Sequence, residues 1–194
     1  DILDLSKVEA GKLEVHPEEF SLKDMVETIN LKFRHMAEQK GFAFKIIVAE
    51  ELLSLVLYTD AQRLKQIINN LLSNAFKFTT RGEVTLEVRR PVSRQEWSGL
   101  ELEPNNTIVV RVTDTGIGIP KDKQNLVFEA LRQADGTTSR RFGGTGLGLS
   151  ISRQLARLLG GDIYLESAEG QGSTFSLYIP EALTAKPKSS KVVP

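Results

Sequence analysis

The sequence of 194 residues predicts an α+β domain. Helical periodicity, with apolar residues three and four positions apart, recurs in three separate segments. These segments are 22–40, 61–78 and 147–159. Short apolar or alternating segments rich in β-branched residues lie between them and indicate strands. These segments are 42–48, 55–58, 83–89, 107–114, 163–167 and 173–179.

Capping and turn residues mark where several of these elements begin and end. Ser21 and Asp60 precede two of the helices and are suited to accept hydrogen bonds from the first free backbone N–H groups. Gly41 and Gly160 follow helices, where glycine permits the left-handed conformation that ends a helix. The last two strands flank residues 169–172, which we interpret as a hairpin turn rather than a binding loop.

The remaining segments are shorter or more polar. Residues 13–22 are predicted to be extended, and residues 121–128 to form a short helix. Residues 1 to about 12 have the spacing of the end of an amphipathic helix. Because the chain begins in the middle of this pattern, we expect it to be a fragment of a longer protein. The tail after Pro180 is rich in Lys, Ser and Pro and predicts a linker.

Composition and charge exclude some classes of function. The chain has 25 basic residues (Lys and Arg) and 25 acidic residues (Asp and Glu), so its net charge is zero. It therefore has no general attraction to nucleic acid or to an anionic membrane. No apolar run approaches the roughly 18 residues of a membrane span. Cysteine is absent, so a disulfide framework is excluded. We expect no nucleic-acid partner and no direct membrane contact.

The helix 61–78 carries a polar stripe beside its apolar face. Gln66, Asn70, Asn74 and Lys77 follow at spacings of four, four and three, which places them in a row. An ordinary solvated face is the alternative, but such faces usually carry Glu and Lys, because Asn is a poor helix former. An amide oxygen suits Mg²⁺ beside a triphosphate, and Lys77 could add positive charge. The stripe therefore predicts a phosphate and magnesium site.

Two glycine-rich segments have the composition of ligand-binding loops. Residues 114–118 follow a predicted strand, and Asp114 could accept a hydrogen bond from an exocyclic amine. Gly144, Gly146 and Gly148 precede or open the last helix, whose N-terminal backbone amides could bind phosphate. This spacing is neither the dinucleotide fingerprint nor a Walker loop. A flexible linker is the alternative, but the helix that follows is strongly apolar.

Together these motifs resemble those of the GHKL, or Bergerat-fold, ATPases, and specifically the catalytic domain of histidine kinases. The similar segments are 66–77 (N box), 114–118 (G1 box), 127–129 (F box), 144–148 (G2 box) and 170–174 (third glycine motif). Their order and rough spacing match over residues 15–181. Five motifs in order are specific, whereas any one of them alone would be weak.

The resemblance implies a two-layer α/β sandwich. A mixed, mostly antiparallel sheet would be backed by three helices, with ATP on the helix side under a mobile lid formed by residues 131–146. Residues 1–14 would be the end of the second dimerisation helix, 15–181 the catalytic domain and 182–194 a linker. The lid sequence and the tail resemble those of hybrid kinases, which carry a receiver domain downstream.

The resemblance also implies roles for individual residues. Asn70 and Asn74 would hold Mg²⁺ and phosphate, and Asp114 would bind the adenine amine. Gln66, Asn70 and Lys77 would form the catalytic set, with Lys77 in contact with phosphate. The other implied nucleotide contacts are Gly116, Gly118, Ile119, Phe128, Arg140, Arg141, Gly144, Thr145, Gly146, Leu147, Gly148 and Thr174.

The implied reaction transfers the γ-phosphoryl group of Mg·ATP to a histidine. His16 and His35 do not match the acceptor motif, so the acceptor is expected on a dimerisation helix outside this chain, in the same or the partner protomer. The implied partners are ATP or ADP, that helix, and a receiver domain in cis or a response regulator. The full-length protein is expected to be a homodimer, with this part in the cytoplasm.

Two departures from the family pattern bear on this prediction. Gln66 stands where gyrase-like and chaperone ATPases carry a glutamate that activates water. Glutamine is a poor general base, which argues against an autonomous hydrolase. Leu131 stands where an aromatic residue is usual in the lid. The alternatives are an ATPase of the gyrase, mismatch-repair or chaperone type, and a non-catalytic module that senses ATP or acts as a scaffold.

Overall fold

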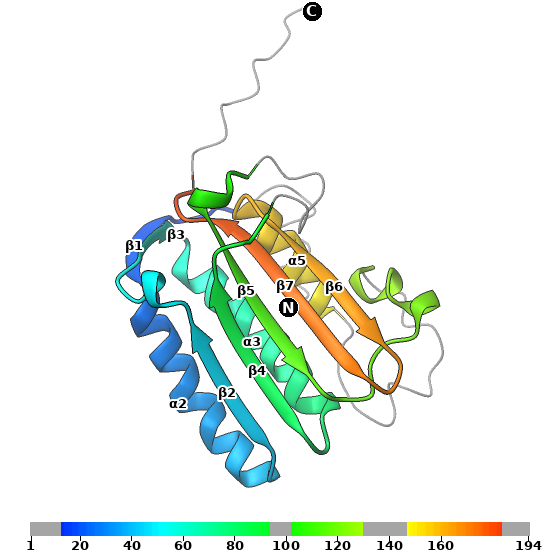
Figure 1. Ribbon diagram of the computed structural model, residues 1–194. Coiled ribbons are helices and arrows are strands. Elements are labelled where there is room, and N and C mark those ends of the chain that lie inside the picture. The colour runs from blue at the N-terminus through cyan, green and yellow to red at the C-terminus, as the bar shows by residue number, and fades with distance from the viewer. Residues whose placement is uncertain (1–12, 94–101, 130–146, 184–194) are drawn as a thin grey trace, which may run out of the picture.

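The computed structural model describes residues 13–93, 102–129 and 147–183. In this part of the chain, five strands form one sheet and three α-helices lie together on one of its faces (Figure 1). The helices are α2 (Leu22–Lys40), α3 (Ala61–Phe78) and α5 (Gly148–Leu158). The strands are β1 (Glu18–Ser21), β2 (Ala43–Val48), β3 (Val56–Thr59), β4 (Glu83–Arg89), β5 (Thr107–Asp114), β6 (Asp162–Ala168) and β7 (Gly172–Pro180). The predicted two-layer α+β architecture is confirmed.

The main sheet has the strand order β2-β4-β5-β7-β6. β2 and β4 are parallel and the other neighbours are antiparallel, so the sheet is mixed and mostly antiparallel, as predicted. Asp114 pairs with Ser173 at one end of the β5–β7 ladder, and Thr107 pairs with Pro180 at the other. This register places the end of β5 beside the start of β7.

A separate two-stranded sheet joins β1 to β3 and leads into α3. Asp60 caps α3, because its Oδ1 accepts a hydrogen bond from the backbone N–H of Arg63 at 3.0 Å. The Oδ2 of the same carboxylate accepts from the backbone N–H of His16 at 3.1 Å. Asp60 therefore ties the incoming chain to the first turn of α3.

The predicted ends of α2 and α5 are also confirmed. Ser21 accepts a hydrogen bond from the backbone N–H of Asp24 at 3.3 Å, which caps α2. Gly41 has a φ of 72° and ends α2 in the left-handed conformation. Gly160 follows α5 with a φ of 81°.

One hydrophobic core lies between the helices and the covered face of the sheet. The apolar face of α3 is fully buried in it, at Leu64, Ile67, Ile68, Leu71, Leu72 and Ala75. Phe76, at the end of the same helix, packs against the rings of Phe33 and Phe42 at 5.1 and 5.0 Å. Each fully buried large apolar side chain contributes about 1.5–3 kcal/mol. The core therefore fixes the position of α3 and of the polar stripe on its flank.

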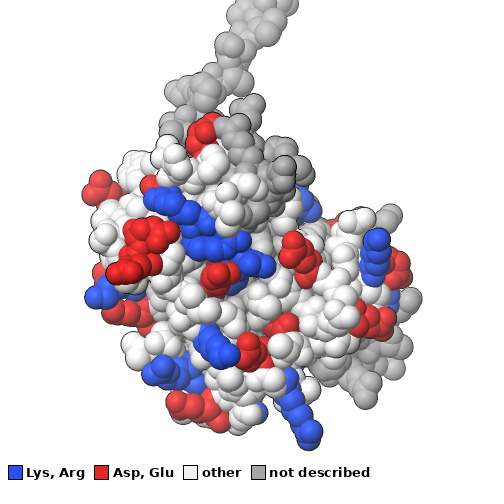
Figure 2. Space-filling view, viewed as in Figure 1, with Lys and Arg blue, Asp and Glu red and all other residues white. Residues whose placement is uncertain are grey.

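The opposite face of the sheet carries charges of both signs (Figure 2), beside a small apolar cluster of Leu102, Val109, Tyr164 and Tyr178. Arg111 Nη1 lies 3.3 Å from Glu87 Oε2, and Arg89 Nε lies 3.8 Å from the same oxygen. Half-exposed ion pairs of this kind contribute about 0–1 kcal/mol each. In the described ranges, no helix is long and apolar enough to cross a membrane.

The structure differs from the prediction over residues 121–128. This segment forms two 3-10 turns, η4 (Lys121–Lys123) and η5 (Leu126–Phe128), rather than one helix. The polar run that starts it offers no apolar stripe, so little burial would stabilise a continuous α-helix. Gln124 instead donates hydrogen bonds to the carbonyl groups of Ile119 and Ser167. The predictions for residues 1–12, 131–146 and 184–194 concern segments outside the described residues.

Candidate functional site

Asn70 joins the polar flank of α3 to the start of α5. Its Nδ2 donates a hydrogen bond to Ser152 Oγ at 2.9 Å. Gly148, the first residue of α5, lies against the same side chain, because a Cβ at Gly148 would lie 2.5 Å from Asn70 Oδ1. α5 begins without a side-chain cap. The amide oxygen of Asn70 therefore lies beside a helix N-terminus, where free backbone N–H groups can bind an anion.

The other members of the predicted stripe lie along the same flank of α3, and all are half-buried. Gln66 Oε1 accepts a hydrogen bond from Arg63 Nη1 at 3.0 Å. Asn74 follows Asn70 by one helical turn. Lys77 Nζ lies over the ring of Phe78, 5.0 Å from its centre. The stripe is therefore a continuous polar flank that meets α5 at Asn70.

Asp114 is a buried carboxylate at the end of β5, with 6% of the residue exposed. Its Oδ1 accepts a hydrogen bond from the backbone N–H of Gly116 at 2.8 Å, and the backbone N–H of Ser173 also donates to the carboxylate. Burial raises the pKa of Asp114 above its usual value, and these two hydrogen bonds only partly offset the effect. The site therefore holds a carboxylate whose charge is poorly solvated, which favours binding a hydrogen-bond donor.

Glycines allow three backbone segments to approach one another around Asp114. A Cβ at Gly116 would lie 2.5 Å from the carbonyl oxygen of Phe78, at the end of α3. Gly172 has a φ of 92°, and a Cβ there would lie 1.9 Å from the carbonyl oxygen of Asp114. The hairpin interpretation of residues 169–172 is confirmed, and its last glycine also packs against Asp114.

The loop after Asp114 is fixed to the β6–β7 hairpin. Gly118 has a φ of 66°, and a Cβ there would lie 1.9 Å from the carbonyl oxygen of Ala168. The backbone N–H of Ile119 donates to Ser167 Oγ at 2.8 Å, and that of Gly170 donates to the carbonyl of Ile117 at 2.7 Å. These contacts hold the loop against the β6–β7 hairpin.

Some of these anchoring residues were not predicted from the sequence. Ser152 binds Asn70, while Ser167 and Gln124 hold the loop. Ser152 gave a usable signal, because a small polar residue on the apolar face of a helix requires a buried partner. Ser167 and Gln124 gave none, because polar residues in a strand and a loop are usually solvated.

The structure separates two predicted residues from the rest. Thr174 lies on the face of the sheet away from the helices, where its Oγ1 is 3.1 Å from Thr113 Oγ1, while its neighbours in β7 face the helices. The side chain of Leu147 is buried in the core, with 3% of the residue exposed. Phe128 is half-buried and packs against the ring of Phe175 at 6.2 Å. Arg140, Arg141, Gly144, Thr145 and Gly146 lie outside the described residues.

The amide oxygens on the flank of α3 are suited to a magnesium ion that is also bound to phosphate. Among residues 13–93, 102–129 and 147–183, no group of three or more His, Cys, Asp and Glu side chains could hold a metal ion. The available oxygen donors are the amides of Asn70 and Asn74. Mg²⁺ keeps several waters and needs few protein ligands when it also binds substrate phosphates. These residues therefore fit Mg²⁺ carried by a nucleotide, not an independent metal site.

Comparison with known proteins places most of the site inside one family match. The profile of the family described as "Histidine kinase-, DNA gyrase B-, and HSP90-like ATPase" matches residues 59–183. The autoinducer 2 sensor kinase/phosphatase LuxQ of Vibrio parahaemolyticus is 40% identical over 181 residues, which are 93% of this chain and 20% of that protein. The signal transduction histidine-protein kinase BarA of Escherichia coli is 39% identical over 179 residues, 92% of this chain and 18% of that protein.

A solved structure agrees with these sequence matches. The crystal structure of full-length ShkA in complex with AMPPNP has a TM-score of 0.76 and 27% identity, and the alignment covers 95% of this chain and 35% of that one. The similarity to this solved structure therefore confirms the predicted fold. The chain spans about one fifth of the length of the curated relatives described above.

Proposed function

Because the chain belongs to the histidine kinase-, DNA gyrase B-, and HSP90-like ATPase family, we propose that it binds Mg·ATP for phosphoryl transfer in a sensor histidine kinase. The relationship to histidine kinases that the motifs predicted is confirmed by the sequence matches. The activity of the whole protein is part of the proposal, since the chain spans about a fifth of these relatives.

The contact between Asn70 and the start of α5 is the observation that carries the proposal. It places an amide oxygen, suited to Mg²⁺, beside a helix N-terminus, suited to phosphate. Asn74 and Lys77 extend the same flank. We assign the triphosphate to this junction, with Asn70 and Asn74 toward the metal and Lys77 toward phosphate. Bound Mg²⁺ would neutralise charge on the phosphate oxygens.

Asp114 marks the adenine end of the proposed site. Its carboxylate is held by Gly116 and Ser173, and its second oxygen can accept a hydrogen bond from the exocyclic amine of adenine. Gly116 and Gly118 would line the base pocket, and without side chains they let the loop pack closely against the backbone of Phe78 and Ala168. Desolvation of the carboxylate strengthens the hydrogen bond that it makes to a donor.

The proposed reaction requires little covalent chemistry from this chain. A histidine imidazole from a dimerisation helix would attack the γ-phosphorus, a P–N bond would form, and the bond to ADP would break. The contribution of this chain is positioning and charge stabilisation. Gln66 accepts a hydrogen bond from Arg63 and is a poor general base, which argues against activation of water for hydrolysis. A receiver domain in cis or a response regulator would take the phosphoryl group, in the cytoplasm.

Calorimetric titration of the chain with Mg·AMPPNP tests the binding step. We expect saturable binding by the wild-type chain, and weaker binding by Asn74→Ala with an unchanged unfolding transition. Failure of the folded wild-type chain to bind would contradict the proposal. Unchanged affinity of Asn74→Ala would remove that residue from the metal site.

The kinase reaction is tested with the full-length protein and ATP labelled at the γ-phosphate. We expect label on a histidine of the full-length protein, and negligible ATP hydrolysis by the chain alone. Steady hydrolysis by the chain alone would instead indicate an ATPase of the gyrase or chaperone type.

A further inference from the structure

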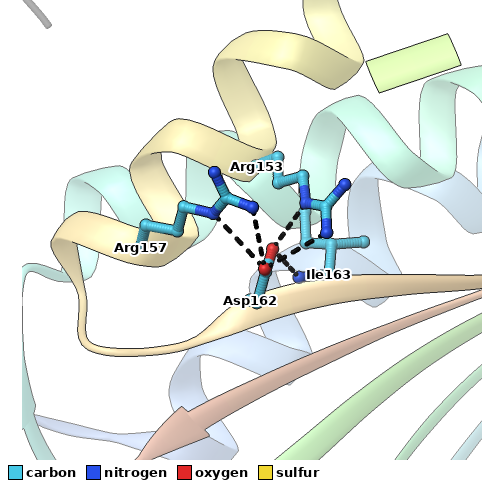
Figure 3. Close-up of polar contacts among 4 residues, drawn as sticks. All are labelled: Arg153, Arg157, Asp162 and Ile163. Carbon is cyan, nitrogen blue, oxygen red and sulfur yellow. Dashed lines mark hydrogen bonds and ion pairs between the residues drawn. The ribbon is translucent and has the colours of Figure 1, made fainter. Parts of the chain in front are cut away.

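Two arginines of α5 bind the same carboxylate at the start of β6 (Figure 3). Arg153 Nε lies 2.8 Å from Asp162 Oδ1, and its Nη2 lies 3.3 Å from Oδ2. Arg157, one helical turn later, reaches Oδ2 at 3.2 and 3.3 Å. The backbone N–H of Ile163 also donates to Oδ1 at 2.7 Å. Both arginines therefore anchor α5 to the sheet through the same carboxylate.

The two arginines differ in their second contact. The guanidinium carbon of Arg153 lies over the ring of Phe128, 4.8 Å from its centre. Among the described residues, no such contact with an aromatic ring involves Arg157. The side chain of Arg157 is 59% exposed, whereas that of Arg153 is 32% exposed. Only Arg153 therefore connects the carboxylate to η5.

The ring of Phe128 is connected to the candidate nucleotide site through β7. It packs edge to face against Phe175 of β7, with ring centres 6.2 Å apart. Phe175 is two residues from Ser173, whose backbone N–H donates to Asp114. Phe128 thus contacts both Arg153 and the strand that supports Asp114.

We propose that Arg153 is a positioning residue for nucleotide binding, which acts by fixing the ring of Phe128. This inference rests on the function proposed above, in which Asp114 binds adenine, because Phe128 packs against the strand that supports Asp114. Asp162 holds the guanidinium at two points, so its plane is fixed. A fixed guanidinium restrains the ring that it faces, both by attraction to the π system and by filling the space beside it. Arg157 has no such role, although it carries the same charge on the same helix face.

Four variants of the chain test the proposal, with Mg·AMPPNP affinity and urea unfolding measured on each. Arg153→Ala should weaken binding by about three- to tenfold, and Arg157→Ala by less than about twofold. Arg153→Lys keeps a cation near Asp162 without the planar group, so stability should recover more than affinity. In Phe128→Ala, the further change Arg153→Ala should have no additional effect on affinity.

The outcomes separate this inference from the proposed function. If the wild-type chain binds and Arg153→Ala equals Arg157→Ala in affinity, Arg153 does not position the site. Additive losses from Arg153→Ala and Phe128→Ala would also overturn the inference, because the two residues would then act independently. Absence of binding by the folded wild-type chain would overturn the proposed function first. Spectra of ¹³C-labelled phenylalanine in the nucleotide-free chain give a separate readout, in which Arg153→Ala should shift the Phe128 signal and Arg157→Ala should not.

Discussion

Asp114 and Asp162 are both buried aspartates of the same sheet, with 6% and 8% of each residue exposed, yet their surroundings are opposite. Asp162 is bound by two arginines and one backbone N–H. Asp114 is bound by two backbone N–H groups, and no Lys or Arg in the described ranges forms an ion pair with it. A carboxylate with its own cations is structural, whereas one with only neutral donors keeps the capacity to bind a ligand.

The pKa values of Asp114 and Asp162 are shifted in opposite directions, although burial acts to raise both. Burial raises the pKa of Asp114, and its two hydrogen bonds do not fully compensate. Burial also acts to raise the pKa of Asp162, but the hydrogen bonds from Arg153 and Ile163 and the charges of Arg153 and Arg157 lower it below the usual value. The difference between the two sites is therefore the nearby positive charge, not the degree of burial.

Gly172→Ala should have the largest effect on this comparison, because it acts on the backbone that supports Asp114. The φ of 92° is strained for alanine, and its Cβ would lie 1.9 Å from the carbonyl oxygen of Asp114. We expect a loss of about 2–5 kcal/mol of unfolding free energy, together with weaker nucleotide binding. Urea unfolding and calorimetry measure the two effects.

Gly170→Ala is the matched control in the same turn. Gly170 also has a left-handed φ, of 76°, but a Cβ there meets nothing within 4 Å. We expect a loss of about 1–2 kcal/mol with unchanged nucleotide affinity. Equal losses in the two variants would show that close packing against Asp114 contributes nothing.

Asp114→Asn should produce the next largest effect, on binding rather than on stability. Asparagine can still accept one backbone hydrogen bond, but it offers adenine an uncharged group. A hydrogen bond to a charged group contributes about 1.5–3 kcal/mol, so nucleotide affinity should fall by about 10- to 100-fold. Unfolding in urea should be unchanged or slightly shifted toward higher stability, because a buried charge is removed. Intact affinity for Mg·AMPPNP would contradict the adenine role.

Asp162→Asn should show the reverse pattern, with its main effect on stability. The variant leaves Arg153 and Arg157 without their carboxylate, but their side chains are 32% and 59% exposed and can be solvated by water. We therefore expect a loss of about 1–2 kcal/mol of unfolding free energy, less than for a fully buried pair. Nucleotide affinity should fall no further than in Arg153→Ala. A larger loss of affinity than in Asp114→Asn would reverse the assignment of the two aspartates.

The two aspartates also show what the sequence could predict. Asp114 was predicted because it ends a strand and begins a glycine-rich loop, which are local features. The stripe of α3 was predicted for a similar reason, since Asn is costly on an exposed helix face. Asp162 and Arg153 were not singled out. Asp162 binds Arg153, and Arg153 in turn contacts Phe128, which comes from a different part of the chain, so no local pattern marks these residues.

Thr174 shows a different limit of sequence reasoning. The motif that contains it was predicted correctly as a hairpin, but side chains in a strand alternate between faces. Phe175 is buried in the core, so the side chain of Thr174 points to the opposite face. This placement could have been inferred from the alternation alone. The contact of Gly172 with Asp114 could not, because it depends on the pairing register of β5 with β7.

The dependence of stability on pH gives the smallest expected effect, and it tests the comparison most directly. The pKa of Asp162 in the folded chain is below the usual value of 3.8, so this carboxylate stabilises the fold fully above that pH and loses its contribution as the pH falls below it. The pKa of Asp114 is above 3.8, so its buried charge costs stability at neutral pH, and this cost disappears as the pH falls through the raised pKa.

Urea unfolding of the wild type, Asp114→Asn and Asp162→Asn at several pH values between about 3 and 7 separates these two contributions. Other carboxylates titrate equally in all three proteins and cancel in the differences. On acidification, the stability advantage of the wild type over Asp162→Asn should shrink, while its stability relative to Asp114→Asn should rise. If both differences moved in the same direction, the two carboxylates would share one kind of environment, and the distinction between a structural and a ligand-binding aspartate would fail.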